Sequence, residues 1–147
     1  MDFRLIIDKH KTEEVVATVH ERSELTDQIE KLVMEYAGTD RVPGYTEDDV
    51  KLIAFSDIEC IVVIDGKTYA VDTGGTRYRL KLRLYELEKM LPACFIRINK
   101  SALANEKRIE RFSVAFGGAV DVVFQCGYKE YVSRRCFAAI KRRFGAE

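Results

Sequence analysis

The stretch Ile58-Glu-Cys-Ile-Val-Val-Ile-Asp-Gly-Lys-Thr-Tyr-Ala-Val-Asp72 decides the fold of this chain. Its first seven residues form a nearly continuous apolar run of strand length. Asp65-Gly66 is a dipeptide that favours a two-residue hairpin turn, and residues 67–72 then form the returning strand. We therefore predict an antiparallel β-hairpin near the middle of the chain, with Lys67 beside its tip.

Short strands separated by turn residues continue on both sides of this hairpin. The further strands are expected over 51–55, 76–81, 95–98, 107–115, 119–125 and 128–132. Leucines at helical spacing predict a short helix over 84–91 that Pro92 ends. A last helix is expected over 133–144, with Ser133 as its N-cap and Phe144 at the end of its apolar face. The pattern predicts an α+β fold that is mostly β.

The N-terminal 42 residues show a different pattern. Two apolar stretches, 3–8 and 15–20, favour strands, and residues 23–36 have the spacing of an amphipathic helix that Gly38 would end. These elements predict a small β-β-α unit over 1–42, which is too short to bury a core alone.

A second domain is expected over 45–147. Pro43, Gly44 and three consecutive acidic residues at 47–49 indicate that the boundary between the two parts lies within 39–49.

Length and composition are those of a globular chain. The 147 residues, 47% hydrophobic and 33% charged, suffice for one domain with a smaller attached unit. No apolar run approaches the roughly 18 residues that span a bilayer, and residues 1–4 lack a signal-peptide pattern. We expect a cytoplasmic protein without a membrane partner.

Residues that could support catalysis or bind a metal are not grouped in the sequence. The four cysteines, Cys60, Cys94, Cys126 and Cys136, show no zinc-ligand spacing, and we expect buried thiols rather than disulfides. No phosphate-binding glycine fingerprint, GxSxG elbow or HExxH motif occurs. We therefore predict no enzymatic activity, no cofactor and no metal.

The neutral total charge hides an acidic front and a basic back. Residues 1–59 carry 7 Lys and Arg against 15 Asp and Glu, whereas residues 92–147 carry 11 against 5. This asymmetry indicates a polyanion partner, although a solvated basic face would show the same composition. Arg134 and Arg135 occupy the expected first turn of the last helix, where free N–H groups also favour phosphate.

The segment Leu82-Arg-Leu-Tyr-Glu-Leu-Glu-Lys-Met-Leu-Pro-Ala-Cys-Phe-Ile-Arg-Ile-Asn-Lys-Ser101 resembles the middle of bacterial LytTR-type DNA-binding domains. That family shows a short Leu-rich helix, then Phe, a hydrophobic residue, Arg, and His-Lys-Ser or His-Arg-Ser. The similarity continues through Phe116-Gly-Gly to Val132-Ser-Arg-Arg and covers about 45–147. It implies an elongated antiparallel fold of small sheets with short helices and no helix-turn-helix, whose loops enter successive major grooves.

The resemblance also implies a function, a partner and a site. It implies a stand-alone transcriptional regulator, since residues 1–44 are too few for a receiver domain, bound as a homodimer to double-stranded DNA with paired half-sites. Lys100, Asn99 and Arg135 are expected to read base edges, although Asn99 replaces the usual His. The expected DNA-binding residues are Lys67, Asn99, Lys100, Lys129, Arg134 and Arg135.

Alternatives stay open on the residues alone. A protein-interaction or small-molecule sensing module would carry the same basic face as a solvated surface. Binding of single-stranded RNA would need aromatic side chains exposed on a sheet, for which Tyr69, Tyr78 and Tyr128 are the candidates. The unit over 1–42 is expected to dimerise or to bind an effector.

Overall fold

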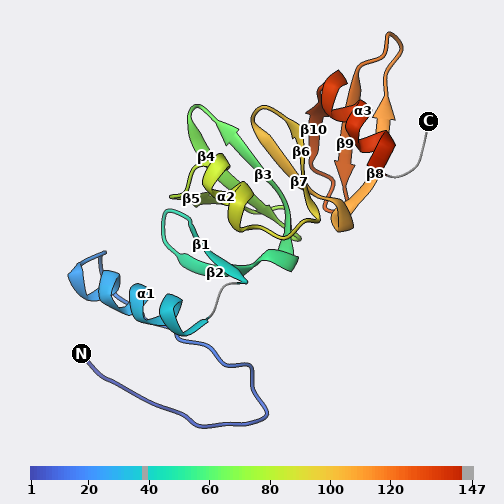
Figure 1. Ribbon diagram of the computed structural model, residues 1–147. Coiled ribbons are helices and arrows are strands. Elements are labelled where there is room, and N and C mark those ends of the chain that lie inside the picture. The colour runs from blue at the N-terminus through green and yellow to red at the C-terminus, as the bar shows by residue number, and fades with distance from the viewer. Residues whose placement is uncertain (38–39, 144–147) are drawn as a thin grey trace. The chain divides into compact units, whose positions relative to one another are not determined.

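A computed structural model describes residues 1–37 and 40–143 of the chain (Figure 1). The chain divides into two compact units, Met1–Gly38 and Thr39–Glu147. Within the residues described, strands separate each helix from the next, so they contain no helix-turn-helix. None of the helices described is long and apolar enough to cross a membrane.

Within residues 1–37, the first unit contains one helix, α1 (Glu24–Ala37), which confirms the predicted helix. The two expected strands are absent, because residues 1–23 form neither strand nor helix. The side chains of Phe3, Ile7 and Val16 are exposed. A two-stranded hairpin is marginal in water unless another layer covers its apolar face, and these side chains have no such cover. The β-β-α prediction was therefore wrong in its strands, and the expected cap at Gly38 lies outside the described residues.

The second unit holds a sheet of 7 antiparallel strands in the order β2-β1-β5-β4-β3-β7-β6. The strands are β1 (Arg41–Tyr45), β2 (Val50–Ala54), β3 (Ile58–Ile64), β4 (Lys67–Asp72), β5 (Arg77–Leu80), β6 (Phe95–Asn99) and β7 (Ala102–Asn105). The short helix η1 (Phe55–Asp57) joins β2 to β3, and α2 (Leu84–Met90) joins β5 to β6. The predicted hairpin is β3–β4, and its turn has the two positive φ angles that the sequence demanded, 51° at Asp65 and 75° at Gly66.

A smaller sheet and the last helix complete the second unit. The sheet has 3 strands in the order β10-β9-β8. They are β8 (Ile109–Val114), β9 (Val120–Phe124) and β10 (Lys129–Val132), and η2 (Glu106–Arg108) connects β7 to β8. The helix α3 (Arg134–Arg143) follows β10 directly, and the Cys136 N–H donates to the Ser133 hydroxyl at 3.2 Å. The predicted cap is confirmed; Phe144 lies outside the described residues.

The larger sheet is covered on both faces at its strand β3. On one face, Leu84 and Leu87 of α2 pack with Ile61 and other residues of the sheet. On the other face, Cys60 and Val62 pack with residues of the smaller sheet and of α3. Burial on both faces explains why β3 is almost continuously apolar instead of alternating.

Two strands were not predicted. The strand β7 is short, and all four of its residues are buried. The strand β1 lies within 39–49, where a boundary was expected, and contains Pro43 and Gly44. Pro43 is tolerated because β1 pairs with β5 only at Tyr45 and Arg79. Gly44 is required by close packing, since a Cβ there would lie 2.5 Å from Ile53 Cδ1.

Candidate nucleic-acid interface

Three chain segments meet at one end of the second unit: the β3–β4 turn, the β6–β7 turn and the connection from β10 to α3 (Figure 1). Backbone hydrogen bonds join them. The Val63 N–H donates to the Ser101 carbonyl at 2.9 Å, and the Ser133 N–H donates to the Ile98 carbonyl at 2.9 Å. We call this end the contact edge; it is built from both sheets and α3.

Four of the predicted DNA-binding cations lie on the contact edge. Lys67 follows the β3–β4 turn, Lys100 occupies the β6–β7 turn, and Arg134 and Arg135 begin α3. All four side chains are exposed. Within residues 1–37 and 40–143, none of them forms an ion pair. These four charges are therefore available to an external anion.

Several other cations of the second unit are already engaged. The guanidinium groups of Arg97 and Arg143 lie 2.7 Å and 2.8 Å from the carboxylates of Glu88 and Glu106. The ammonium group of Lys81 lies 4.3 Å from the centre of the Tyr45 ring. Arg97, Arg143 and Lys81 therefore stabilise the fold, in contrast to the four cations of the contact edge.

The start of α3 suits an anion for two reasons. The helix has 10 residues, and its N-terminus carries the positive end of the helix dipole. Arg134 and Arg135 add guanidinium groups there, which form paired hydrogen bonds to phosphate or to the O6 and N7 atoms of guanine. The second half of the helix is held in place, because the Arg143 guanidinium also donates to the Ala93 carbonyl at 3.1 Å.

Lys129 lies away from this row of charges. It is the first residue of β10, whereas the contact edge is at the end of that strand. At about 3.3 Å per residue, the four-residue strand separates Lys129 from Ser133 by on the order of 13 Å. Its side chain is exposed, so it remains a candidate for a more distant phosphate.

Asn99 lies at the contact edge, but its side chain is buried, with 1% exposure. Its Nδ2 donates to the Tyr131 carbonyl at 2.8 Å, and its Oδ1 accepts from the Ser101 N–H at 2.7 Å. The strand register shifts between Arg97 and Asn99. This bulge breaks the alternation that would have placed the two side chains on one face. In this conformation both ends of the Asn99 amide form hydrogen bonds with the protein's own backbone.

A carboxylate and a phenol lie beside Asn99. Glu130 Oε1 is 3.5 Å from Asn99 Nδ2, and the Tyr128 hydroxyl donates to Glu130 Oε2 at 3.4 Å. Burial raises the pKa of the Glu130 carboxyl above its ordinary value. Burial, followed by the Glu130 charge, raises the pKa of Tyr128 to about 12. Both groups are therefore partly withdrawn from water.

The three tyrosines considered for RNA stacking already have partners. Tyr128 contacts Glu130, and its ring lies 6.3 Å from that of Phe124. Cations cover the rings of the other two: Arg77 lies 5.6 Å from the Tyr69 centre, and Lys51 lies 5.7 Å from the Tyr78 centre. All three side chains are half-buried. They do not form an open row of aromatic faces.

Arg97 supports the contact edge, and the sequence did not suggest this role. Its Nη1 donates to the Lys100 carbonyl at 3.0 Å, and its Nη2 lies 2.7 Å from Glu88 Oε2 in α2. The side chain therefore braces the β6–β7 turn against α2. The only signal was its place three residues before Lys100 in the motif Phe-Ile-Arg-Ile-Asn-Lys-Ser.

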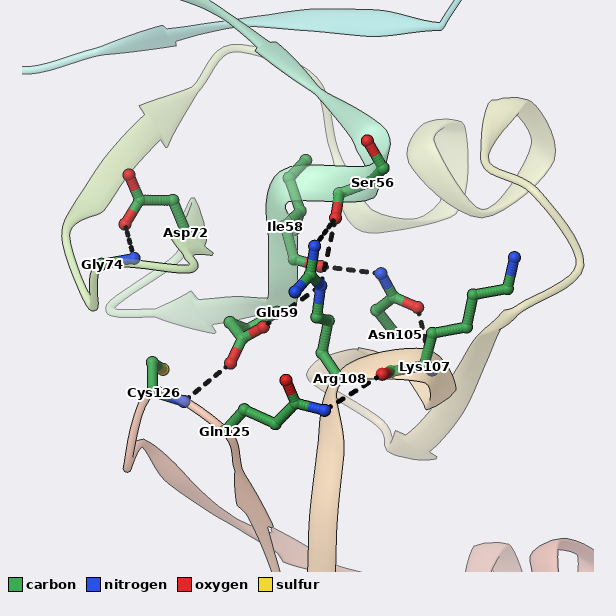
Figure 2. Close-up of polar contacts among 10 residues, drawn as sticks. All are labelled: Ser56, Ile58, Glu59, Asp72, Gly74, Asn105, Lys107, Arg108, Gln125 and Cys126. Carbon is green, nitrogen blue, oxygen red and sulfur yellow. Dashed lines mark hydrogen bonds and ion pairs between the residues drawn. The ribbon is translucent and has the colours of Figure 1, made fainter.

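A second buried polar group joins the two sheets at their other end (Figure 2). Glu59 of β3 is 1% exposed, and its Oε1 accepts from the Cys126 N–H at 2.8 Å. Its Oε2 lies 3.7 Å from Arg108 Nε, while Arg108 Nη2 donates to the Ser56 carbonyl at 2.8 Å. This Glu59–Arg108 joint ties η2 and the β9–β10 turn to β3. A lone glutamate in an apolar run was its sequence signal.

Comparison with known proteins identifies relatives of the whole chain and of its second unit. The family model described as the LytTr DNA-binding domain matches residues 48–145. Proteins of Staphylococcus aureus strains NCTC 8325 / PS 47 and MRSA252, named as HTH-type transcriptional regulators, are 32% identical over 146 residues. That similarity covers 97% of this chain and 97% of each relative.

A solved structure shares the fold of the second unit. It is the LytTr DNA-binding domain of a methyl-accepting/DNA response regulator from Bacillus cereus, with a TM-score of 0.67 and 24% sequence identity. The match covers 74% of this chain and 99% of that one. The mostly β, antiparallel fold expected from the sequence is confirmed.

Proposed function

Because the chain belongs to the family of LytTR DNA-binding domains, we propose that it regulates transcription by binding specific sequences of double-stranded DNA and occupying an operator. The observation that carries this proposal is the contact edge, where three adjoining segments present four exposed cations that form no ion pair with the residues the structure describes. The names of its relatives, which describe transcriptional regulators, support the same function.

The contacts divide by chemistry. Lys67, Lys100 and Arg135 are proposed to enter the grooves and reach base edges, because each lies in or beside a turn or at the start of α3. Arg134 and the more distant Lys129 are proposed to bind phosphates, which position the domain without reading sequence. Asn99, expected from the sequence to read bases, has its amide buried inside the protein.

We also propose that two copies act together on paired half-sites. The first unit is the candidate for dimerisation, since Phe3, Ile7 and Leu32 are among its exposed apolar side chains. Effector binding by the same residues is the alternative. Sedimentation velocity of the full chain, with and without DNA, distinguishes the two: a concentration-dependent dimer without DNA supports dimerisation, and a strict monomer contradicts it.

The test of DNA binding is fluorescence anisotropy across a salt series. The full chain is titrated into a duplex that it enriches from a random pool and into a scrambled duplex of equal length. We expect tight binding to the enriched duplex only, with affinity falling steeply as salt rises. Weak and equal binding to both duplexes would favour the protein-interaction or sensing module.

Substitution at the contact edge tests the assigned residues. Arg135→Ala should weaken binding to the enriched duplex by about 1–3 kcal/mol and relax selectivity at one position of the site. Arg111→Ala is the matched control, because Arg111 is exposed on β8 and its nearest acid is Glu110, at 3.8 Å. Equal losses on both duplexes would assign Arg135 to phosphate alone.

A further inference from the structure

We infer that Asn99 is a positioning residue that holds two separate DNA-contact segments, the Lys100 turn and the start of α3, in fixed register. This inference rests on the proposed function and adds a residue that acts through Lys100 and Arg135 without touching DNA. The Lys100 turn joins two strands of the larger sheet, whereas α3 follows β10 of the smaller sheet. One amide group of Asn99 bonds to Ser101 in the Lys100 turn and to Tyr131 of β10, three residues before α3 begins.

One half of the amide shapes the Lys100 turn. Asn99 Oδ1 accepts from the Ser101 N–H at 2.7 Å, which is the side-chain-to-backbone bond that Asn forms in turns. Lys100 lies between these two residues and is exposed. The Ser101 carbonyl then accepts from the Val63 N–H at 2.9 Å, so the same turn is tied to the hairpin that presents Lys67.

The other half of the amide holds the approach to α3. Asn99 Nδ2 donates to the Tyr131 carbonyl at 2.8 Å, four residues before Arg135. Beside it, the Ser133 N–H donates to the Ile98 carbonyl at 2.9 Å. The end of β10 is therefore fastened to the end of β6 by two bonds, one from the side chain and one from the backbone.

The chemistry at this position requires a side chain that carries both a hydrogen-bond donor and an acceptor. The side chain must accept from one segment and donate to the other, and it does so with 1% exposure, where water cannot replace a lost partner. Aspartate keeps the acceptor but cannot donate, and it would place a second carboxylate near Glu130. Serine can still accept from the Ser101 N–H but is too short to reach Tyr131.

The relative position of the two segments matters because a side chain recognises a base only at the correct distance and angle. Productive contacts need their groups held within about 0.5 Å by supporting side chains. If the smaller sheet shifts against the larger one, Arg135 moves relative to Lys100. The two side chains can then no longer reach their bases at the same time. Phosphate contacts tolerate such a shift better, since a cation acts on them mainly as a charge.

Asn105 offers a matched control within the same hairpin. It is 2% exposed, its Nδ2 donates to the Ile58 carbonyl at 3.0 Å, and its Oδ1 accepts from the Lys107 N–H at 3.1 Å (Figure 2). The two asparagines thus share burial and bonding pattern. Asn105 lies opposite Phe95, at the end of the β6–β7 hairpin away from Lys100.

The experiment compares Asn99→Ser with Asn105→Ser in the full chain. Anisotropy is measured on the enriched and scrambled duplexes, beside thermal unfolding of each variant. Asn99→Ser is expected to reduce the preference for the enriched duplex at least about tenfold, whereas Asn105→Ser keeps the wild-type preference at a similar loss of stability. Equal preferences in the two variants would overturn the inference.

Amide hydrogen exchange without DNA provides the second measurement. In Asn99→Ser, the Ser101 amide should stay protected while the Ser133 amide exchanges faster than in wild type. Unchanged exchange at Ser133 would show that Asn99 does not fix the register. If the wild-type chain enriched no duplex at all, the proposed function would fail, and this exchange result would still decide whether Asn99 couples the two segments.

Discussion

Cys60 illustrates how the surroundings of a single residue can suppress its chemical reactivity. Its side chain has no solvent exposure, and burial raises the pKa of the thiol far above its ordinary value. The thiolate, which is the reactive form, is therefore scarce and inaccessible. We predict that iodoacetamide labels the half-buried Cys94 and Cys136 in the native protein and spares Cys60, as measured by peptide mass spectrometry. Labelling of Cys60 without unfolding would contradict this account.

Glu130 gives a prediction about pH. Burial raises the pKa of its carboxyl above 4.5, so the folded state binds this proton more tightly than the unfolded state. The protonated Glu130 carboxyl therefore favours the folded state. This stabilisation is lost as pH rises from 4.5 through the raised pKa, and above that window the ionised carboxylate weakens the fold. Glu130→Gln should raise the free energy of unfolding at pH 7 by about 0.5 kcal/mol, a value kept small by solvent screening.

The measurement is urea unfolding of wild type and Glu130→Gln at several pH values. The difference should vanish well below pH 4.5, where the wild-type carboxyl is protonated in both the folded and the unfolded state. A constant difference at all pH values would assign the effect to packing and not to the charge. Glu110→Gln, on an exposed side chain of β8, is the control for removal of a surface charge.

At the scale of elements, the Glu59–Arg108 joint fastens one end of the smaller sheet to the larger one. Arg108→Ala removes the charge facing Glu59 and leaves a carboxylate that is 1% exposed with the Cys126 N–H as a partner but no facing cation. Breaking a buried pair in this way costs roughly 3 kcal/mol. We predict a loss of that size in urea unfolding, and a smaller loss when Arg108→Ala is combined with Glu59→Gln. Equal losses in the single and double variants would contradict the ionic role.

The cap of α3 gives a second prediction at this scale. Ser133→Ala removes the hydroxyl that accepts from the Cys136 N–H. It should lower the free energy of unfolding by about 1 kcal/mol, whereas Ser133→Asp retains an acceptor and should cost less. Chemical denaturation followed by circular dichroism measures both variants. An Asp variant as unstable as the Ala variant would show that the cap bond contributes little.

For the whole molecule, the position of β1 decides where the chain can be cut. Val42 is 1% exposed, and β1 joins β2 to the rest of the larger sheet. We predict that removing residues 1–37 leaves the thermal unfolding of the second unit nearly unchanged. Removing residues 1–45 deletes β1 and should lower the melting temperature strongly or prevent folding. Comparable melting of the two truncated proteins would contradict the placement of β1 in the core.

The sequence by itself determined the elements whose signals are local. The β3–β4 hairpin follows from an apolar run and Asp65-Gly66, and α3 follows from Ser133 and its helical spacing. The exposure of Lys100 and Arg135 followed in the same way, since a cation in a turn or a first helical turn projects into water. The family resemblance, which covers about 45–147, added DNA as the partner. No local signal in the sequence specifies that partner.

Only the tertiary structure decided the features that depend on distant partners. The strand β1 is held by neighbours, which overrides the turn preference of Pro43 and Gly44, while the apolar residues of 3–8 and 15–20 find no covering layer. The bulge that buries Asn99 and the joint that buries Glu59 both arise where the two sheets meet. Because such pairings join residues far apart in the chain, no periodicity within one segment could have specified them.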